Sequence, residues 1–188
     1  MALGAMVYKA QLSISNLDRG WYGQPVLTIA RHPSETEKRL MLRVLAWCVR
    51  AGEHLEFGRG LSSDGEPALW ETDDTGAIIE WVELGAPDVR TVRKAAGKSE
   101  HVLVLAYDEA RTKPWWESVK GELSKIDKLT VIFIPDSEAD ALAALAAMAL
   151  RSMKFAVTIQ DSVIWVNSDT ADVQINPEYL KRETQRWT

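Results

Sequence analysis

The sequence predicts an α/β fold in which helices cover a mixed sheet and β-hairpins lie at both ends of the chain. Three observations support this prediction. Residues 34–107 follow helical and extended patterns in the order α-β-β-β-α-β. Residues 7–31 and 155–167 each contain two extended stretches separated by a turn. The 188 residues fit one domain with a substantial core, so we expect a single domain over residues 1–188.

The first strong helix is predicted to begin near Ser34, after an opening β-ribbon. Ser34 and Glu37 have the spacing of a capping box, in which the two side chains satisfy the first backbone N–H groups of a helix. Gly52 is expected to end this helix. The apolar residues that follow the box at helical spacing are Leu40, Met41, Val44, Leu45 and Cys48.

Three extended segments come next, at residues 55–59, 67–72 and 77–84. The stretches between them, residues 62–65 and 73–76, are rich in Ser, Asp, Thr and Gly, which favour tight turns. Short strands joined by such turns predict an antiparallel meander.

A strand-helix-strand unit follows the meander. A helix is predicted from about Asp88 to Gly97, and a buried strand covers residues 101–107. Because such connections are almost always right-handed and parallel, the strands at 77–84 and 101–107 should pair in parallel. This α-β-β-β-α-β core, about residues 34–107, is the most informative structural prediction from the sequence.

The remaining chain continues the α/β pattern. Helices are predicted at residues 114–123 and 139–150, with an apolar strand at 129–134 between them. A closing hairpin covers residues 155–167. The last dozen residues are polar, and we expect them to be loosely held.

Bulk properties restrict the class of protein. The net charge of −5 and the pI of about 5.3 argue against tight, non-specific binding of nucleic acid, although a local basic patch remains compatible with both. The single cysteine, Cys48, lies in an apolar helical pattern, as expected in a reducing compartment. No signal-peptide pattern follows Met1, and no apolar run is long enough to cross a bilayer. We therefore expect a cytoplasmic protein that is not inserted in a membrane.

Glu83 is the strongest chemical signal in the sequence. It ends the apolar strand at residues 77–84, and side-chain alternation places it on the same face as Trp81. Ligand and metal sites in open α/β sheets favour the carboxyl ends of covered strands. The alternative is a solvated residue at the strand end, or one paired with an arginine.

Two further carboxylates are candidates for the same site. Glu37 lies at the start of the first predicted helix, although the capping box alone also explains its presence. Glu66 directly precedes Pro67, and antiparallel pairing across the turn at residues 73–76 would bring it close to Glu83. We expect a site built from these three carboxylates.

The helix that begins near Asp88 supplies candidate cations. Val89, Val92 and Ala96 define its buried face, Arg93 lies beside that face, and Lys94 flanks it. A guanidinium that reaches inward at Arg93 would need a carboxylate partner.

These features together resemble the PD-(D/E)XK nuclease superfamily and, more closely, the YaeQ family of bacterial proteins. The resemblance covers nearly the whole chain. The segments that carry it are Ala30-Arg31-His32-Pro33-Ser34-Glu35-Thr36-Glu37, Asp64-Gly65-Glu66-Pro67-Ala68-Leu69-Trp70, Trp81-Val82-Glu83-Leu84-Gly85-Ala86-Pro87-Asp88 and Thr158-Ile159-Gln160-Asp161-Ser162-Val163-Ile164-Trp165.

The resemblance implies a nuclease-like core and a site for Mg²⁺, in which acidic residues hold the ion that activates water. By position, Glu37 matches the helix acid and Glu83 the strand acid of the nucleases. Two positions depart from the signature: Ala68 follows Pro67 where an Asp is expected, which leaves Glu66 as the substitute. Gly85 stands where a lysine is expected, so a cation from the next helix, Lys94 or Arg93, would have to replace it.

Two functional hypotheses follow, and a third has no residue in its favour. The favoured hypothesis is a non-catalytic descendant that keeps the fold and a degenerate acidic site and binds a protein or nucleic-acid partner. The alternative is a Mg²⁺-dependent phosphodiesterase or nuclease that uses Glu37, Glu66 and Glu83 with Lys94 or Arg93. The third is a small-molecule binder in the same cleft.

Overall fold

The computed structural model describes residues 6–59, 65–148 and 151–184. Within these residues the chain forms four helices and twelve strands. The helices are α1 (Glu37–Val49), α2 (Val89–Lys98), α3 (Glu109–Leu123) and α4 (Asp136–Met148). The strands are β1 (Met6–Asn16), β2 (Trp21–Gly23), β3 (Val26–Arg31), β4 (Leu55–Phe57), β5 (Leu69–Thr72), β6 (Ile78–Leu84), β7 (Ser99–Ala106), β8 (Leu129–Phe133), β9 (Ser152–Gln160), β10 (Val163–Asn167), β11 (Asp172–Ile175) and β12 (Glu178–Lys181).

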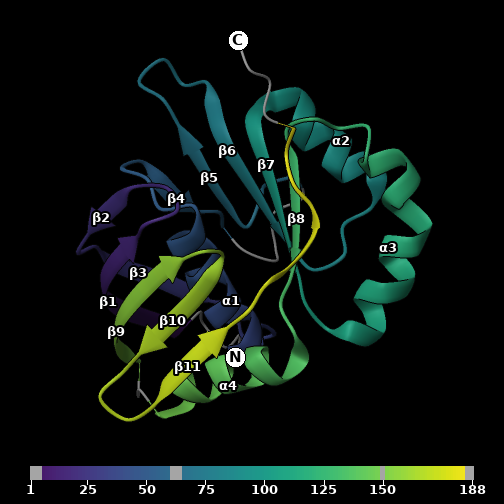
Figure 1. Ribbon diagram of the computed structural model, residues 1–188. Helices are drawn as coiled ribbons and strands as arrows, with labels where there is room; N and C mark the ends of the chain where they lie inside the picture. The colour runs from purple at the N-terminus through teal and green to yellow at the C-terminus, as the bar shows by residue number, and fades with distance from the viewer. Residues whose placement is uncertain (1–5, 60–64, 149–150, 185–188) are drawn as a thin grey trace.

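The central sheet has the strand order β12-β8-β7-β6-β5-β4 (Figure 1). Strands β4, β5 and β6 pair antiparallel, and β6, β7 and β8 pair in parallel. The predicted meander and the parallel strand-helix-strand unit are both confirmed. Asp88 caps α2 by accepting a hydrogen bond from the backbone N–H of Thr91 at 2.6 Å, so the loop after β6 turns directly into the helix.

The second sheet is built from the two ends of the chain. Its strand order is β11-β10-β9-β1-β2, with β3 also paired to β1. The predicted N-terminal ribbon is the antiparallel pair of β1 and β3, and the predicted closing hairpin is the pair of β9 and β10. Strands β1 and β9 pair in parallel, which joins the two hairpins into one sheet.

Helix α1 lies at the centre of the larger hydrophobic core. Its side chains pack with apolar residues from both sheets and from α4. Helices α2 and α3 cover the opposite face of the central sheet, where they bury a second cluster that includes Trp81 and Val104 (Figure 1). The central sheet therefore has apolar cover on both faces, as its apolar strands predict.

The predicted capping box at the start of α1 is wrong. Thr36 is the N-cap, and its hydroxyl accepts a hydrogen bond from the backbone N–H of Arg39 at 3.1 Å. Ser34 instead hydrogen-bonds His32. The helix ends at Val49 with Arg50 as its C-cap, before Gly52. Glu37 is thus the first helical residue rather than the third, which changes the direction of its side chain.

Two other helices begin earlier than predicted. Helix α3 starts at Glu109, because Asp108 caps it and Pro114 lies inside the helix instead of opening it. A proline at that place removes one backbone hydrogen bond without ending the helix. Helix α4 starts at Asp136, directly after Pro135, and the predicted end of this helix, residues 149–150, lies outside the described residues.

The expectation of a loose C-terminal segment is also wrong for the described part. Strand β12 pairs antiparallel with β8 at the edge of the central sheet. Lys181 donates a hydrogen bond to the backbone carbonyl of Leu129 at 2.9 Å. The polar composition hid this strand because an edge strand needs only one apolar face.

The part of the chain that the structure describes contains no helix long and apolar enough to span a membrane.

Candidate functional site

Glu83 lies one residue before the end of β6, on the face that α2 covers. It pairs in register with Val104 of β7 and is half-buried. The indole N–H of Trp81 donates a hydrogen bond of 2.8 Å to its carboxylate. Because alternate residues of a strand point to the same side, this contact follows directly from the strand geometry.

Burial raises the pKa of Glu83 above its ordinary value of 4.5. Three groups oppose the rise: the Trp81 hydrogen bond and the positive charges of Arg39 and Lys94. The Glu83 carboxylate is therefore stabilised by one hydrogen-bond donor on β6 and by two positive charges, one on α1 and one on α2. Such a mixture of desolvation and nearby charge is common at functional sites.

Glu66 approaches the same end of the sheet from the neighbouring strand. Leu69 of β5 is paired with Val82 of β6, and the Ala68 backbone N–H donates to the Val82 carbonyl at 2.9 Å. This register places the Glu66-Pro67 segment beside the end of β6, as the sequence predicts. The Glu66 side chain turns back to Arg59, with an ion pair of 3.4 Å and a hydrogen bond of 3.3 Å from the Arg59 backbone N–H.

Glu37 points in another direction. Its carboxylate lies 3.8 Å from the Arg31 guanidinium, and 42% of its side-chain surface is exposed. The start of α1 at Thr36 places Glu37 on the side of the helix that faces β3. Each of the three predicted acids thus has its own partner, and the described residues contain no group of three or more His, Cys, Asp or Glu side chains arranged around a metal position.

Lys94 is the α2 cation that faces the site. A β-carbon built on Gly65 would lie 2.7 Å from the Lys94 ammonium, so this ammonium packs directly against the Gly65-Glu66 segment. Gly65 has a φ of +85°, which also favours glycine at this position. Lys94 has no ion pair within the described residues. It lies between the loop that carries Glu66 and the strand that carries Glu83.

Arg93 does not take part in this arrangement. It forms an ion pair with Glu122 of α3 and is largely exposed. A helix advances about 100° per residue, so neighbouring positions on α2 face different elements. The carboxylate partner that the sequence requires for Arg93 therefore exists, but it lies on α3 rather than at Glu83.

Gly85, which stands where the nuclease lysine is expected, occupies a position that favours glycine. Its φ is +91°, and its N–H donates to the Leu105 carbonyl at 2.9 Å. A lysine there would be strained, because L-residues with a Cβ rarely adopt this conformation. This backbone geometry leaves the role of site cation to residues from other elements.

Arg39 is the site residue that the sequence does not reveal. Its guanidinium lies 3.7 Å from Glu35. It is also close enough to Glu83 to oppose the rise that burial causes in the pKa of Glu83. Its Nη1 atom is buried and has no hydrogen-bond partner. The signal that could have found it is the spacing of Arg39 and Arg43, which places two guanidinium groups on one side of α1 beside Glu35.

The YaeQ protein family model matches residues 1–177 of the chain. "Uncharacterized protein YaeQ" of Escherichia coli (strain K12) is 40% identical over 176 residues, which cover 94% of this chain and 96% of that protein. The protein of the same description from Salmonella typhi is 39% identical over 175 residues, 93% of this chain and 95% of the relative.

Solved structures agree with the sequence matches. The crystal structure of YaeQ protein from Xanthomonas axonopodis pv. citri superposes with a TM-score of 0.90 at 40% identity, over 96% of this chain and 99% of that one. The structure of YaeQ protein from Pseudomonas syringae gives a TM-score of 0.87 at 34% identity, over 95% and 97% of the two chains. The two mixed sheets and their helices are therefore a shared architecture, and the chain belongs to the YaeQ family.

Proposed function

We propose that this chain is a non-catalytic, cytoplasmic relative of the PD-(D/E)XK nucleases that binds nucleic acid at the Glu83 end of β6. The observation that carries the proposal is the pair of underused cations there. Lys94 is exposed and has no ion pair within the described residues, and the Nη1 atom of Arg39 has a 3.7 Å ion pair with Glu35 but no hydrogen-bond partner. Phosphodiester oxygens are the acceptors that such donors bind well.

The acidic residues of the site support binding over cleavage. Arg59 engages Glu66, Arg31 engages Glu37, and Trp81 engages Glu83. Each carboxylate would have to leave its partner before three of them could share one Mg²⁺.

Because the net charge of the chain is −5, the attraction for phosphates would be confined to the cations at the Glu83 end of β6. We expect modest affinity with a shallow salt dependence, because only a few phosphates would be neutralised.

Mg²⁺-dependent phosphodiester cleavage is the second candidate. It is favoured by the register of β5 and β6, which brings the Glu66 segment beside Glu83 at the carboxyl end of a covered strand. In that case Glu66 and Glu83 would be the ligands nearest each other, and Glu37 would have to turn away from Arg31. The ion would supply an activated water and stabilise the leaving oxygen.

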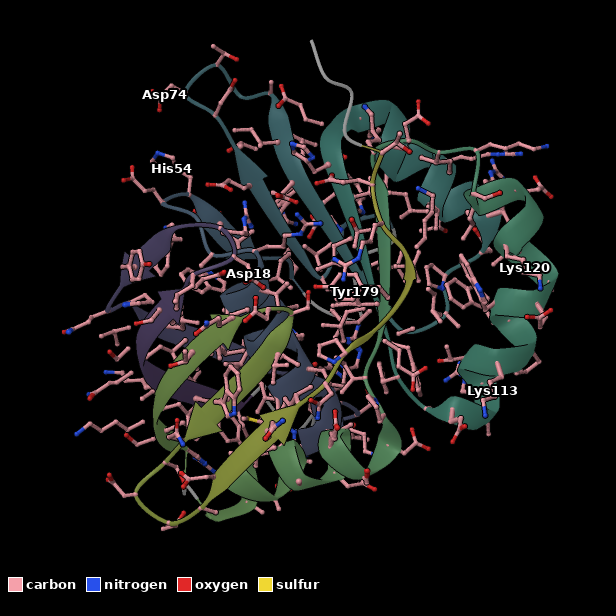
Figure 2. The ribbon with its side chains drawn as sticks, viewed as in Figure 1. Asp18, His54, Asp74, Lys113, Lys120 and Tyr179 are labelled. Atoms are coloured by element: carbon pink, nitrogen blue, oxygen red, sulfur yellow. The ribbon has the colours of Figure 1, made fainter. Side chains whose placement is uncertain are left out.

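Binding is tested by fluorescence anisotropy with labelled single- and double-stranded DNA and RNA of equal length. The variants are Lys94→Gln and Arg39→Gln, and the matched control is Lys120→Gln on the outer face of α3 (Figure 2). Each site variant should weaken binding by about tenfold, since a charge-assisted hydrogen bond contributes about 1.5–3 kcal/mol. Equal affinities for wild type and both site variants would contradict the proposal.

Cleavage is tested with the same substrates in Mg²⁺ and in Mn²⁺, comparing wild type with Glu83→Ala. No cleavage by either protein, with binding retained, is the expected result. Turnover by wild type that Glu83→Ala abolishes would replace the binding proposal with the nuclease alternative. Turnover that survives this substitution would indicate a contaminant.

A further inference from the structure

A polar cavity lies between the two sheets, on the face of β6 opposite Glu83. Its volume is about 360 Å³. Arg19, Arg50 and Arg182 line it together with Tyr179, and apolar wall is contributed by Val49 and Ile159. Asp18, after β1, and Tyr179, on β12, also line the cavity, and both are labelled in Figure 2.

Arg50 is the deepest cation of this cavity. The residue is 9% exposed, and its Nε atom is buried without a hydrogen-bond partner. One of its terminal nitrogens lies 3.5 Å from the Glu80 carboxylate. A buried guanidinium with an unmet donor carries a desolvation cost that an added acceptor would relieve.

Glu80 compensates these cations only in part. A single oxygen, Oε1, lies 3.5 Å from both Arg19 and Arg50, while Oε2 is buried without a partner. Charge-assisted hydrogen bonds between guanidinium and carboxylate groups normally measure about 2.7–2.9 Å. Two arginines therefore share one distant carboxylate oxygen, which leaves guanidinium donors between the sheets without a close acceptor.

Two further acids, Asp18 and Glu183, line the cavity, and their closest contacts lie outside the pair of Arg19 and Arg50. Asp18 accepts hydrogen bonds of 2.8 Å from the backbone N–H groups of Asp161 and Ser162, and so anchors the turn of the β9–β10 hairpin. Glu183 lies 2.9 Å from His101. Neither contact neutralises Arg50.

Arg182 completes the rim. Its guanidinium carbon lies 3.4 Å from the centre of the Tyr179 ring, and its Nη2 donates to the Ser162 hydroxyl at 3.3 Å. Tyr179 and the aliphatic residues Val49 and Ile159 add apolar surface to a cavity that three arginines also line. This combination suits a ligand that has an anionic head and a small apolar body.

We propose that the inter-sheet cavity binds a small organic acid whose carboxylate or phosphate head is held by Arg19 and Arg50. The volume is near the lower end of the range of about 300–1,000 Å³ found for small-molecule sites, so a compact ligand fits it better than a nucleotide. Glu80 acts in this proposal as an internal competitor for the two arginines. The ligand displaces that weak contact and supplies a closer acceptor for the terminal nitrogens of Arg50.

The test is isothermal titration calorimetry on the full chain with 3-phenylpropanoate and phenyl phosphate, and with 3-phenylpropanamide as the uncharged match. At least one acid should bind and the amide should not. Glu80→Gln removes the competing charge at constant shape, so it should tighten binding by about tenfold, whereas Arg19→Gln should weaken it by about tenfold. The matched control is Arg111→Gln, an exposed arginine on α3.

Amide chemical shifts distinguish the proposed cavity from other places on the chain. Binding should move the signals of Val49, Thr130 and Tyr179. Equal affinity for the acid and the amide would overturn the proposal. So would weaker binding by Glu80→Gln together with tighter binding by Arg19→Gln. Chemical-shift changes confined to the Glu83 end of β6 would also overturn it. If Glu80→Gln does not fold, the loss of binding in Arg19→Gln and Arg182→Gln, with Arg111→Gln unchanged, decides the question alone. Failure of nucleic-acid binding at Lys94 leaves this result unaffected.

Discussion

Two carboxylates of β6, Glu80 and Glu83, show how one strand can serve two environments. They lie on opposite faces of the central sheet, and burial raises the pKa of both. Helix α1 places an arginine near each of them: Arg50 from its C-terminal end for Glu80, and Arg39 from its N-terminal end for Glu83. The two ends differ in how the carboxylate is compensated.

At Glu80 the cost of burying the carboxylate is offset by the charges of two arginines of the same chain. The side chain is 2% exposed and faces two arginines, both at 3.5 Å. At Glu83 the largest compensation is a hydrogen bond from the neutral indole of Trp81, and the positive charges of Arg39 and Lys94 add to it. The comparison teaches that the contacts of the buried Glu80 contribute to stability, whereas the half-buried Glu83 contributes less to stability and lies at the end of β6 where we propose nucleic-acid binding.

The largest expected effect comes from removing Arg50. In Arg50→Met, the buried Glu80 keeps only the half-exposed Arg19, and breaking a buried pair costs about 3–5 kcal/mol. We expect a loss of about 3 kcal/mol in the free energy of unfolding, measured by urea denaturation, because Arg19 remains. Arg39→Met at the other end should cost about 1 kcal/mol or less, since Glu83 keeps its Trp81 contact. Equal losses of unfolding free energy in Arg50→Met and Arg39→Met would contradict the difference between the Glu80 and Glu83 ends.

A smaller effect is expected at the start of α1, the end that carries Arg39. Thr36→Ala removes the N-cap hydrogen bond to Arg39 and should cost about 1 kcal/mol. Ser34→Ala is the control and should change stability by less than about 0.5 kcal/mol, because its hydroxyl makes only a solvent-exposed hydrogen bond with His32. Hydrogen exchange should show faster opening of the first turn of α1 in Thr36→Ala and no change near Arg50. A larger loss of stability in Ser34→Ala than in Thr36→Ala would indicate that Ser34, rather than Thr36, caps α1.

The smallest effect is a dependence on pH. Burial raises the folded pKa of Glu83, so the folded state binds more protons than the unfolded chain as pH rises above 4.5. The contribution of Glu83 to the stability of the fold is therefore fully present below pH 4.5, and it is lost as the pH rises through the raised pKa of Glu83. Glu83→Gln cannot ionise and keeps an acceptor for Trp81, so its stability relative to wild type should increase over this window. Urea denaturation between pH 4 and 7 measures the difference, and a decrease with pH would show that the surrounding cations outweigh burial.

Local signals predicted most of the fold that surrounds Glu83. Asp88 caps α2, the turn at residues 73–76 joins β5 to β6, and the right-handed connection makes β6 and β7 parallel. Each depends on neighbouring residues or on a general rule of chain handedness. The position of Glu66 beside the end of β6 follows from the same turn.

What the sequence missed depends on contacts between distant segments. Nothing local specifies that β1 pairs with β9, so the two terminal hairpins could not be joined into one sheet. The choice of Lys94 over Arg93 depends on the rotation of α2 relative to α3 and β6. Arg39 and Arg50 were hidden because a charged residue at the end of an apolar helix usually faces water.

The salt dependence of nucleic-acid binding tests the central claim most directly. The dissociation constant of a labelled oligonucleotide is measured from 50 to 200 mM KCl for wild type, Lys94→Gln and Lys98→Gln, the last being an exposed lysine of the same helix. If Lys94 contacts a phosphate, its substitution should reduce the slope of log K against log salt by about 1, and Lys98→Gln should leave it unchanged. A slope that is the same in all three proteins would contradict nucleic-acid binding at the Glu83 end of β6.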